Sequence, residues 1–473
     1  MSLVTALLFL GGTANPEGGR QRTDKAEARR AASAQAAFPS RRARVKSVPE
    51  KVKGIFVCAG YNSKGTVWRI ASQTAHEFRV TGWFLRMRRI VYFVGAGLTK
   101  ALEKPGKPIP LMNDFIRVMA EYADSDDIIL TTLAELENAG VFESNCPEAA
   151  ELARRVVGKN QTRSPDVKSA FKTAMMKRPS ESIERLLAKA LARDPRADGP
   201  SGTALVIRFT YAINRFFSLL NWNLNWEPIE RFLRDQFRRY PVQGNVHTFV
   251  SFNYDLVLDR SVQKLAGDYW NPFTGYGFKI HWYMEKGKEK PSNIAVEPIP
   301  CDGIYVLKPH GSLNWLVPQD RSGKTGDIGY LLTDGPALLP LGKKGELRYS
   351  EWVEPKAMLF SNNYGESMAV CIIPPTDPAK RVTLGFIERT RCMERKAIEE
   401  ADEVYVLGWS IPRSDEDQRL LIAQAIAQRD RPISQVNAVT KDAGEEYFED
   451  VRQLLGSVNL AKHNNGFWEF VEK

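Results

Sequence analysis

Short apolar runs alternate along the chain with longer stretches of helical periodicity. The runs are rich in β-branched residues and apolar on both faces, which is typical of strands in a sheet that helices cover on both sides. Strands that alternate with helices in this way predict an α/β protein with a Rossmann-like, doubly wound parallel sheet. The predicted strands are residues 90–94, 248–252, 304–307, 403–407 and 435–439.

A different texture separates the first two predicted strands. Apolar residues recur there at helical spacing, as over 183–191 and 206–220. We predict a helical subdomain, inserted into the sheet domain over about residues 111–240. Residues 268–300 and 317–370 are rich in glycine, proline and aromatic residues, and we expect long loops with some extra strands there.

The first 86 residues have another composition. Residues 15–50 are rich in Ala, Arg, Ser, Gly and Pro and hold few large apolar side chains, so burial cannot offset the entropy of ordering them. A clear strand pattern begins only after Met87. We therefore predict a basic, disordered extension over 1–86 and a single domain over 87–473. An upstream start codon would explain the same pattern, which leaves open whether 1–86 are translated.

The formal net charge of +10 is spread unevenly. Residues 1–89 hold 17 Lys and Arg against 5 Asp and Glu, whereas residues 90–473 hold 49 against 51. The sheet domain therefore has no large positive field, and nucleic acid would bind only indirectly or through the basic extension. No apolar run approaches the roughly 20 residues of a membrane span, and residues 1–14 lack the positive start of a secretory signal. We expect a cytoplasmic protein that does not bind membranes.

The cysteines are Cys58, Cys146, Cys301, Cys371 and Cys392, with no C-x-x-C pair. Their number and spacing favour neither a zinc site nor a disulfide framework. Reduced thiols in the cytosol are the simplest interpretation.

The first candidate for chemistry is the turn Gly95-Ala96-Gly97, between a predicted strand and a helical pattern. Glycines at such a turn let the backbone approach a pyrophosphate, whose charge the start of the following helix stabilises. The full G-x-G-x-x-G spacing is absent, so a tight turn without a ligand explains the residues equally well.

Polar residues follow the next two predicted strands. Asn253 and Asp255 come after the second strand, and the carboxyl ends of strands are where doubly wound sheets bind ligands. Either residue could instead cap the helix predicted for 256–265. His310 follows the third strand and precedes Gly311. An imidazole there could act as a general base near neutral pH, or be a structural histidine.

The fourth predicted strand ends at Gly408 and is followed by Ser410. In a doubly wound sheet these residues would face the same crevice as the first two motifs. Ser414 is the expected N-cap of the next helix, because acidic residues follow it in the first turn.

In chain order, the GAG, FNYD, HG and GWS motifs resemble the sirtuin-like superfamily, and specifically the divergent sirtuin-like NADase domains of bacterial anti-phage defence proteins. The resemblance covers roughly residues 88–460. It implicates Pro110 and the turn 374–376 near the pocket, and it places Thr99 where many members have Ser. It implies that Asn253 and His310 are catalytic and that NAD is bound by Gly95, Ala96, Gly97, Thr99, Asp255, Gly408 and Ser410.

One departure from the family pattern bears on the activity. Protein-deacylating sirtuins carry a four-cysteine zinc module between the His and Gly-x-Ser motifs, where this chain has only Cys371 and Cys392. The resemblance therefore favours an NAD glycohydrolase that needs no metal and releases nicotinamide and linear or cyclic ADP-ribose. A sirtuin-type protein deacylase or ADP-ribosyltransferase, a non-catalytic sensor of NAD or ADP-ribose, and a nucleic-acid-binding module remain alternatives.

The resemblance also implies roles and regulation. Asn253 would orient the attacking water and the ribose, His310 would accept a proton, and Asp255 would hold the nicotinamide side. NAD would be the substrate, in abortive-infection defence. Because constant NAD consumption is toxic, the resemblance implies a gate: an activating phage product, a homo-oligomer, or a partner such as a translocase ATPase or an Argonaute-type protein.

Overall fold

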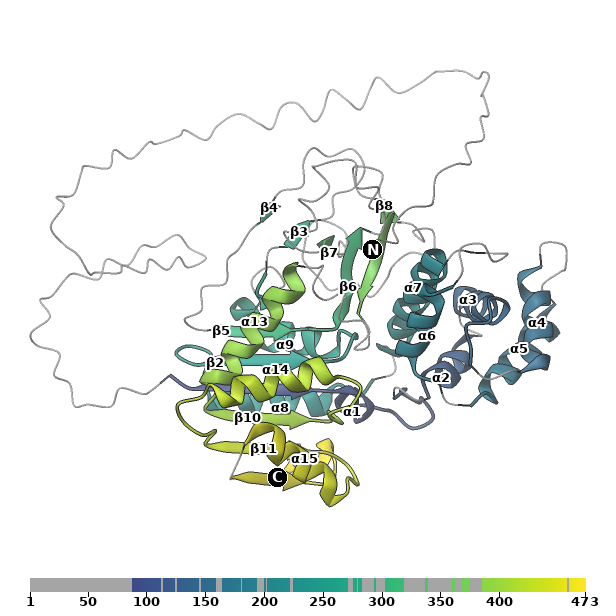
Figure 1. The fold of residues 1–473 in the computed structure, drawn as a ribbon. Helices are drawn as coiled ribbons and strands as arrows, with labels where there is room; N and C mark the ends of the chain where they lie inside the picture. The colour runs from purple at the N-terminus through teal and green to yellow at the C-terminus, as the bar shows by residue number, and fades with distance from the viewer. Residues whose placement is uncertain are drawn as a thin grey trace, which may run out of the picture. The chain divides into compact units, whose positions relative to one another are not determined.

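The computed structural model (Figure 1) describes much of the chain from residue 87 to residue 473. The predicted extension 1–86 and the turn 374–376 lie outside the described residues. Within 87–473, the residues not described are 112–113, 124–125, 144–145, 159–163, 180, 194–199, 201, 222–223, 271–274, 279, 283–292, 295–302, 319–336, 339–359, 362–366, 374–384 and 457–458.

A six-stranded sheet forms the centre of the fold, and every neighbouring pair of its strands is parallel. Its spatial order is β12-β11-β10-β1-β2-β5. Numbered by position in the chain, this is the order 3-2-1-4-5-6 of Rossmann folds, which confirms the predicted fold class. The strands are β1 (Arg89–Val94), β2 (Val246–Ser251), β5 (Gly303–Leu307), β10 (Glu403–Leu407), β11 (Gln435–Val439) and β12 (Leu460–His463).

Both faces of the sheet are buried, as the uninterrupted apolar runs predict. In β1, Tyr92 and Val94 pack into one apolar cluster, whereas Val91 and Phe93 pack into another. The side chains alternate because successive residues of a strand point to opposite faces.

Helices cover both faces of this sheet (Figure 1). Phe232 packs edge-on against Tyr92 and Phe467, with ring centroids 5.9 and 5.5 Å away. The sheet is therefore doubly wound. One face carries α8 (Glu227–Arg239), α9 (Val257–Ala266) and α16 (Phe467–Glu472), and the other carries α13 (Gly385–Glu400), α14 (Glu416–Ala427) and α15 (Glu445–Leu455).

A helical region connects β1 to β2, as predicted for about 111–240. The last helix of that range, α8, packs on the sheet. Before α8 come α1 (Ala96–Lys100), α2 (Phe115–Glu121), α3 (Asp127–Asn138), α4 (Pro147–Val157), α5 (Pro165–Met176), α6 (Ile183–Leu191) and α7 (Gly202–Asn221).

Among the described helices, none is long and apolar enough to cross a membrane.

The extra strands expected around residues 268–300 and 317–370 form a second, mixed sheet of order β4-β3-β7-β6-β9-β8. Its strand β6 (Gly311–Pro318) begins just beyond the end of β5, so residues 308–310 form the link between the two sheets. The other strands are β3 (Ile280–Trp282), β4 (Asn293–Ile294), β7 (Ala337–Leu338), β8 (Phe360–Ser361) and β9 (Ser367–Ile372).

Candidate active site

The carboxyl ends of β2, β1 and β10 lie side by side, with β5 next to β2. Backbone hydrogen bonds join the turns that follow them. The Gly95 N–H donates to the Leu407 carbonyl oxygen (3.0 Å), and the Phe252 N–H donates to that of Val94 (2.9 Å). The four sequence motifs therefore meet at one edge of the sheet, which includes the switch point between β1 and β10 where Rossmann folds bind dinucleotides.

At the switch point the two glycine turns touch each other. The Gly97 N–H donates to the Gly408 carbonyl oxygen (2.9 Å). A Cβ on Gly97 would lie 2.8 Å from that oxygen, and one on Gly408 would lie 2.3 Å from the Leu98 nitrogen. Gly408 also has a φ of +58°, which favours glycine. Close backbone packing is thus a sufficient reason for these glycines, and their contact with a pyrophosphate stays a prediction.

Asn253 is held by the first turn. Its Nδ2 donates to the Gly95 carbonyl oxygen (3.0 Å) and to Thr99 Oγ1 (3.2 Å). Among the described residues, no hydrogen bond to the Asn253 Oδ1 is found. Asn253 is buried, at 9% exposure, and the two bonds from Nδ2 fix its carboxamide nitrogen.

Asp255 has partners for both carboxylate oxygens. Oδ2 accepts from the Thr99 hydroxyl (3.0 Å), and Oδ1 accepts from the Val257 N–H (3.0 Å) at the start of α9. Burial raises the pKa of the Asp255 carboxyl, against the opposing attraction of the Lys308 ammonium. The N-cap position of α9 is Leu256, and Asp255, one residue earlier, supports the start of the helix through its bond to the Val257 N–H.

Lys308 is a completely buried cation that does not stand out in the sequence. Its ammonium donates to the Asp255 carbonyl oxygen and lies 3.1 Å from Asp259 Oδ2. The Tyr276 hydroxyl donates to the other Asp259 oxygen (2.6 Å). This arrangement fastens the end of β5 to the start of α9, and with it the segment that carries Asn253.

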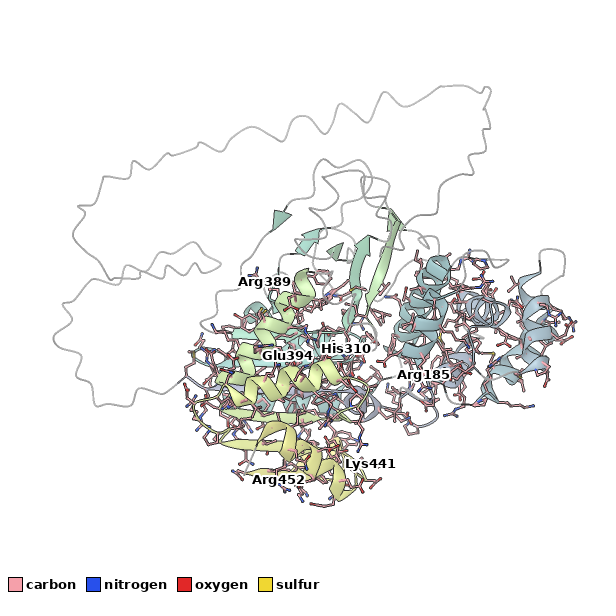
Figure 2. All side chains as sticks on the ribbon, viewed as in Figure 1. Arg185, His310, Arg389, Glu394, Lys441 and Arg452 are labelled. Carbon is pink, nitrogen blue, oxygen red and sulfur yellow. The ribbon has the colours of Figure 1, made fainter. Side chains whose placement is uncertain are left out.

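His310 lies in the link between the sheets and is 3% exposed (Figure 2). Its Nε2 is 2.9 Å from Oδ2 of the fully buried Asp415, an ion-pair contact whose geometry is not that of a hydrogen bond. The ring centroid lies 5.6 Å from that of Phe252 and 6.5 Å from that of Tyr254. A Cβ on Gly311 would lie 2.1 Å from the Cys371 carbonyl oxygen, so the residue after His310 has to be glycine.

The segment between β10 and α14 brings Asp415 to His310. The helix begins one residue later than expected, because Asp415 and not Ser414 is its N-cap residue, and Ser414 is exposed. Ile411 has a φ of +51°, which is rare for a β-branched residue and marks backbone strain beside the site. The sequence shows Asp415 only as one acid in a run, so its contact with His310 was not expected.

Two further predicted residues differ in exposure. Ser410 is exposed, two positions beyond Gly408. Pro110 is buried and follows Ile109, whose carbonyl oxygen accepts from the Lys100 ammonium (2.8 Å) at the end of α1. Cys371 is buried and Cys392 is exposed, and the described residues contain no group of three His, Cys, Asp or Glu side chains that could hold a metal.

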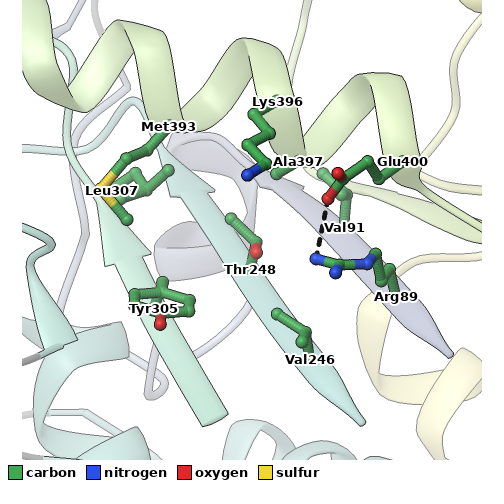
Figure 3. A pocket seen from close by; sticks show the side chains of 10 residues that line it. All are labelled: Arg89, Val91, Val246, Thr248, Tyr305, Leu307, Met393, Lys396, Ala397 and Glu400. Carbon is green, nitrogen blue, oxygen red and sulfur yellow. Dashed lines mark ion pairs between the residues drawn. The ribbon is translucent and has the colours of Figure 1, made fainter. Parts of the chain in front are cut away.

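A pocket also lies between α13 and the face of β1, β2 and β5 (Figure 3). It contains none of the predicted site residues. Arg89 and Glu400 form an ion pair there at 2.8 Å. The remaining lining residues are Val91, Val246, Thr248, Tyr305, Leu307, Met393, Lys396 and Ala397.

No protein-family model matches the chain, and no curated protein matches it either. The structure itself defines a class: an α/β protein with a Rossmann-like, six-stranded parallel sheet flanked by helices. A helical region lies between the first and second strands of that sheet in the chain. In folds of this class, ligands bind at the carboxyl edge of the sheet.

Proposed function

We propose that this chain is an NAD-consuming enzyme that hydrolyses NAD to nicotinamide and ADP-ribose. The observation that carries the proposal is that a fixed carboxamide, Asn253, and a buried imidazole, His310, follow neighbouring strands at the edge that includes the switch point. Doubly wound sheets bind dinucleotides at that point. The resemblance of the four motifs to sirtuin-like NADases supplies the substrate.

The proposed reaction breaks the bond between the ribose C1′ and the nicotinamide nitrogen. The bonding electrons leave with nicotinamide, the ribose passes through an oxocarbenium-like state, and a water oxygen bonds to C1′. Asn253 orients the water and the ribose, and His310 takes up the proton that the water loses. Because the Asn253 Nδ2 is tied to Gly95 and Thr99, its carboxamide needs no reorganisation when NAD binds.

The remaining site residues are proposed to surround the dinucleotide. The turn Gly95–Gly97 and Gly408 would lie along the phosphates, and the exposed Ser410 hydroxyl would face the adenosine side. Thr99 and Asp255 hold Asn253 in place through buried hydrogen bonds. For Asp255 these contacts favour a supporting role over direct contact with nicotinamide.

In this proposal the enzyme works in the bacterial cytoplasm in abortive-infection defence against phage. NAD depletion harms the cell that carries it out, so the activity would be gated by a phage product, by a homo-oligomer, or by a translocase ATPase or Argonaute-type partner. The basic extension would contact nucleic acid only in that regulatory role.

The test begins with NAD binding by the full chain, measured by calorimetry, and continues with product analysis of the activated protein. We expect NAD to bind and nicotinamide and ADP-ribose to appear in equal amounts without any peptide. Nicotinamide release that requires an acyl-lysine peptide would indicate a deacylase, and binding without turnover in the activated protein would indicate a sensor. A chain that does not bind NAD at millimolar concentration would contradict the proposal.

A further inference from the structure

His310 faces a buried carboxylate that reaches it from a distant part of the chain. Oδ2 of Asp415 lies 2.9 Å from His310 Nε2, and both side chains are almost fully buried, at 0% and 4% exposure. His310 follows β5, whereas Asp415 precedes α14. Two separate elements of the fold therefore bring these two groups together.

Asp415 is the N-cap residue of α14, a position where a carboxylate usually bonds to the backbone of its own helix. An Asp at an N-cap usually accepts a hydrogen bond from a backbone N–H of the first helical turn. Asp126 does so in α3, where it accepts from the Ile128 N–H (2.9 Å). Asp415 makes no such bond in α14. One of its carboxylate oxygens instead lies 2.9 Å from the imidazole.

The effect of a carboxylate on an imidazole is well defined. A neutral histidine carries its proton on one ring nitrogen, and the partner of that nitrogen decides which tautomer is present. A carboxylate oxygen 2.9 Å from Nε2 favours the proton on that nitrogen, because a bare lone pair there would face negative charge, and Nδ1 is then the acceptor. Among the described residues, neither ring nitrogen of His310 has a hydrogen-bond partner, so the 2.9 Å contact with Asp415 is what distinguishes Nε2 from Nδ1. The aromatic rings of Phe252 and Tyr254, which also lie near His310, do not select a tautomer in this way.

We propose that Asp415 is a positioning residue that holds His310 as the Nε2–H tautomer, so that Nδ1 is the nitrogen that accepts a proton. The catalytic part of this statement rests on the proposed NAD hydrolysis. The same logic operates in the Ser-His-Asp triad, where the Asp orients the imidazole and stays ionised. Asp415 would then act on the reaction only through His310.

The first experiment reads the tautomer and does not depend on catalysis. The full chain is labelled with ¹⁵N-histidine, and long-range proton–nitrogen spectra are recorded at a pH where histidine is neutral. The His310 signals are identified among the five histidines by their absence in His310→Gln. We expect the Nε2–H form in the wild type and in the control Glu416→Gln, which removes the neighbouring, exposed acid. In Asp415→Asn we expect Nδ1–H or a mixture.

The second experiment measures nicotinamide release by the activated protein. Asp415→Asn should lower kcat by at least about 10²-fold, the lower bound for a general acid–base contribution, while KM stays within about twofold. Glu416→Gln should remain within about twofold of wild type in both constants. Adding Asp415→Asn to His310→Ala should cause little further loss, because the two residues act as one unit.

The outcomes separate this inference from the proposed function. An unchanged tautomer in Asp415→Asn, or an Nδ1–H tautomer in the wild type, overturns the role of Asp415 even if NAD is hydrolysed. If Asp415→Asn does not fold, the wild-type tautomer alone decides. A tautomer that changes as expected in a protein that never consumes NAD supports the pairing and contradicts the proposed function instead. Wild-type kcat in Asp415→Asn overturns the inference as well.

Discussion

Two buried histidines in this protein have contrasting surroundings. His247 lies within β2 and is fully buried; its Nδ1 is 3.0 Å from the Tyr92 hydroxyl oxygen and its Nε2 is 2.7 Å from the Tyr240 carbonyl oxygen. His310 lies beyond the end of β5, where Nε2 faces Asp415. Both side chains are hidden from solvent, so burial alone does not distinguish them.

The difference lies in their partners and in their position along the sheet. Burial lowers the pKa of His247 to about 4, so its ring is neutral at physiological pH and both of its nitrogens have partners inside the core. Such a histidine holds structure together. His310 stands at the edge where doubly wound sheets bind ligands, beside an acid from another element. The comparison predicts that one histidine supports stability and the other supports chemistry.

The largest stability effect should come from the buried cation beneath the candidate site. Lys308→Met removes the partner of a fully buried Asp259, and breaking such a pair costs about 3–5 kcal/mol. Urea unfolding measures the loss. The matched control is Lys264→Met, which breaks the ion pair of the exposed Lys264 with the partly buried Glu230 and should cost less than about 1 kcal/mol. Equal losses in the two variants would show that Lys308 does not anchor the site.

Replacing His247 should lower the free energy of unfolding and leave kcat nearly unchanged. His247→Gln removes the imidazole from the Tyr240 carbonyl oxygen, at about 1–3 kcal/mol for that buried group, whereas the Tyr92 hydroxyl keeps its hydrogen bond to Gln236. The free energy of unfolding at pH 7 measures this loss. The kcat of the activated variant should stay within about threefold of wild type, and a larger loss would mean that the two histidines are not functionally distinct.

The same variant has a definite pH dependence. Burial lowers the pKa of folded His247 from the ordinary 6.5 to about 4, so between these values the unfolded state takes up a proton and the folded state does not. Its contribution to stability is complete above pH 6.5 and declines by about 1.4 kcal/mol per pH unit as the pH falls toward 4. The gap between wild type and His247→Gln should therefore narrow on acidification. A gap that is the same at pH 7 and pH 5 would contradict the lowered pKa.

A smaller effect is expected where the two glycine turns meet. Gly408→Ala places a Cβ against the backbone of Gly97 and Leu98, whereas Gly140→Ala meets nothing within 4 Å at a similar φ of +65°. Both variants carry the strain of a positive φ, so the difference between them isolates the contact. Overpacking costs about 1–3 kcal/mol, and Gly408→Ala should be less stable than Gly140→Ala by that amount in urea unfolding. Equal stability would show that the turns can separate without cost.

The smallest effect should follow removal of residues 1–86. Their composition predicts that they form no core of their own and add little to the sheet domain. A chain that starts at Met87 should keep its melting temperature within about 2 °C and should still bind NAD, by thermal scanning and calorimetry. Aggregation or lost binding would mean that the extension packs on the domain, and would move the predicted boundary.

The sequence predicts most of the central sheet because its strands are short apolar runs. The ranges 403–407 and 435–439 match β10 and β11, and 248–252 overlaps β2 with a shift of two residues at its start. Strand β12 was missed because Leu460–His463 is brief and partly polar, as befits an edge strand. The second sheet was expected only as extra strands, since several of its strands have two or three residues.

The sequence predicted the site residues that belong to local motifs, and it missed those that matter through contacts with distant parts of the chain. Asn253, Thr99 and Gly95 meet as expected because the carboxyl ends of parallel strands share one edge. Lys308 and Asp415 were missed because their importance comes from partners that are distant in the chain. In the sequence, Lys308 at a strand end resembles a surface charge, and Asp415 resembles one of the acids in the first turn of a helix.

The central claim is that Asn253 and His310 act on the same NAD ribose. The direct measurement is nicotinamide release by activated wild type, Asn253→Ala, His310→Ala and the double variant, with NAD binding measured in parallel. Each single change should lower kcat by at least about 10²-fold while NAD still binds, and the double variant should lose far less than the product of the two. If activated His310→Ala hydrolyses NAD within about threefold of wild type, far short of the general-base range, His310 is a structural histidine like His247 and the proposed mechanism is wrong.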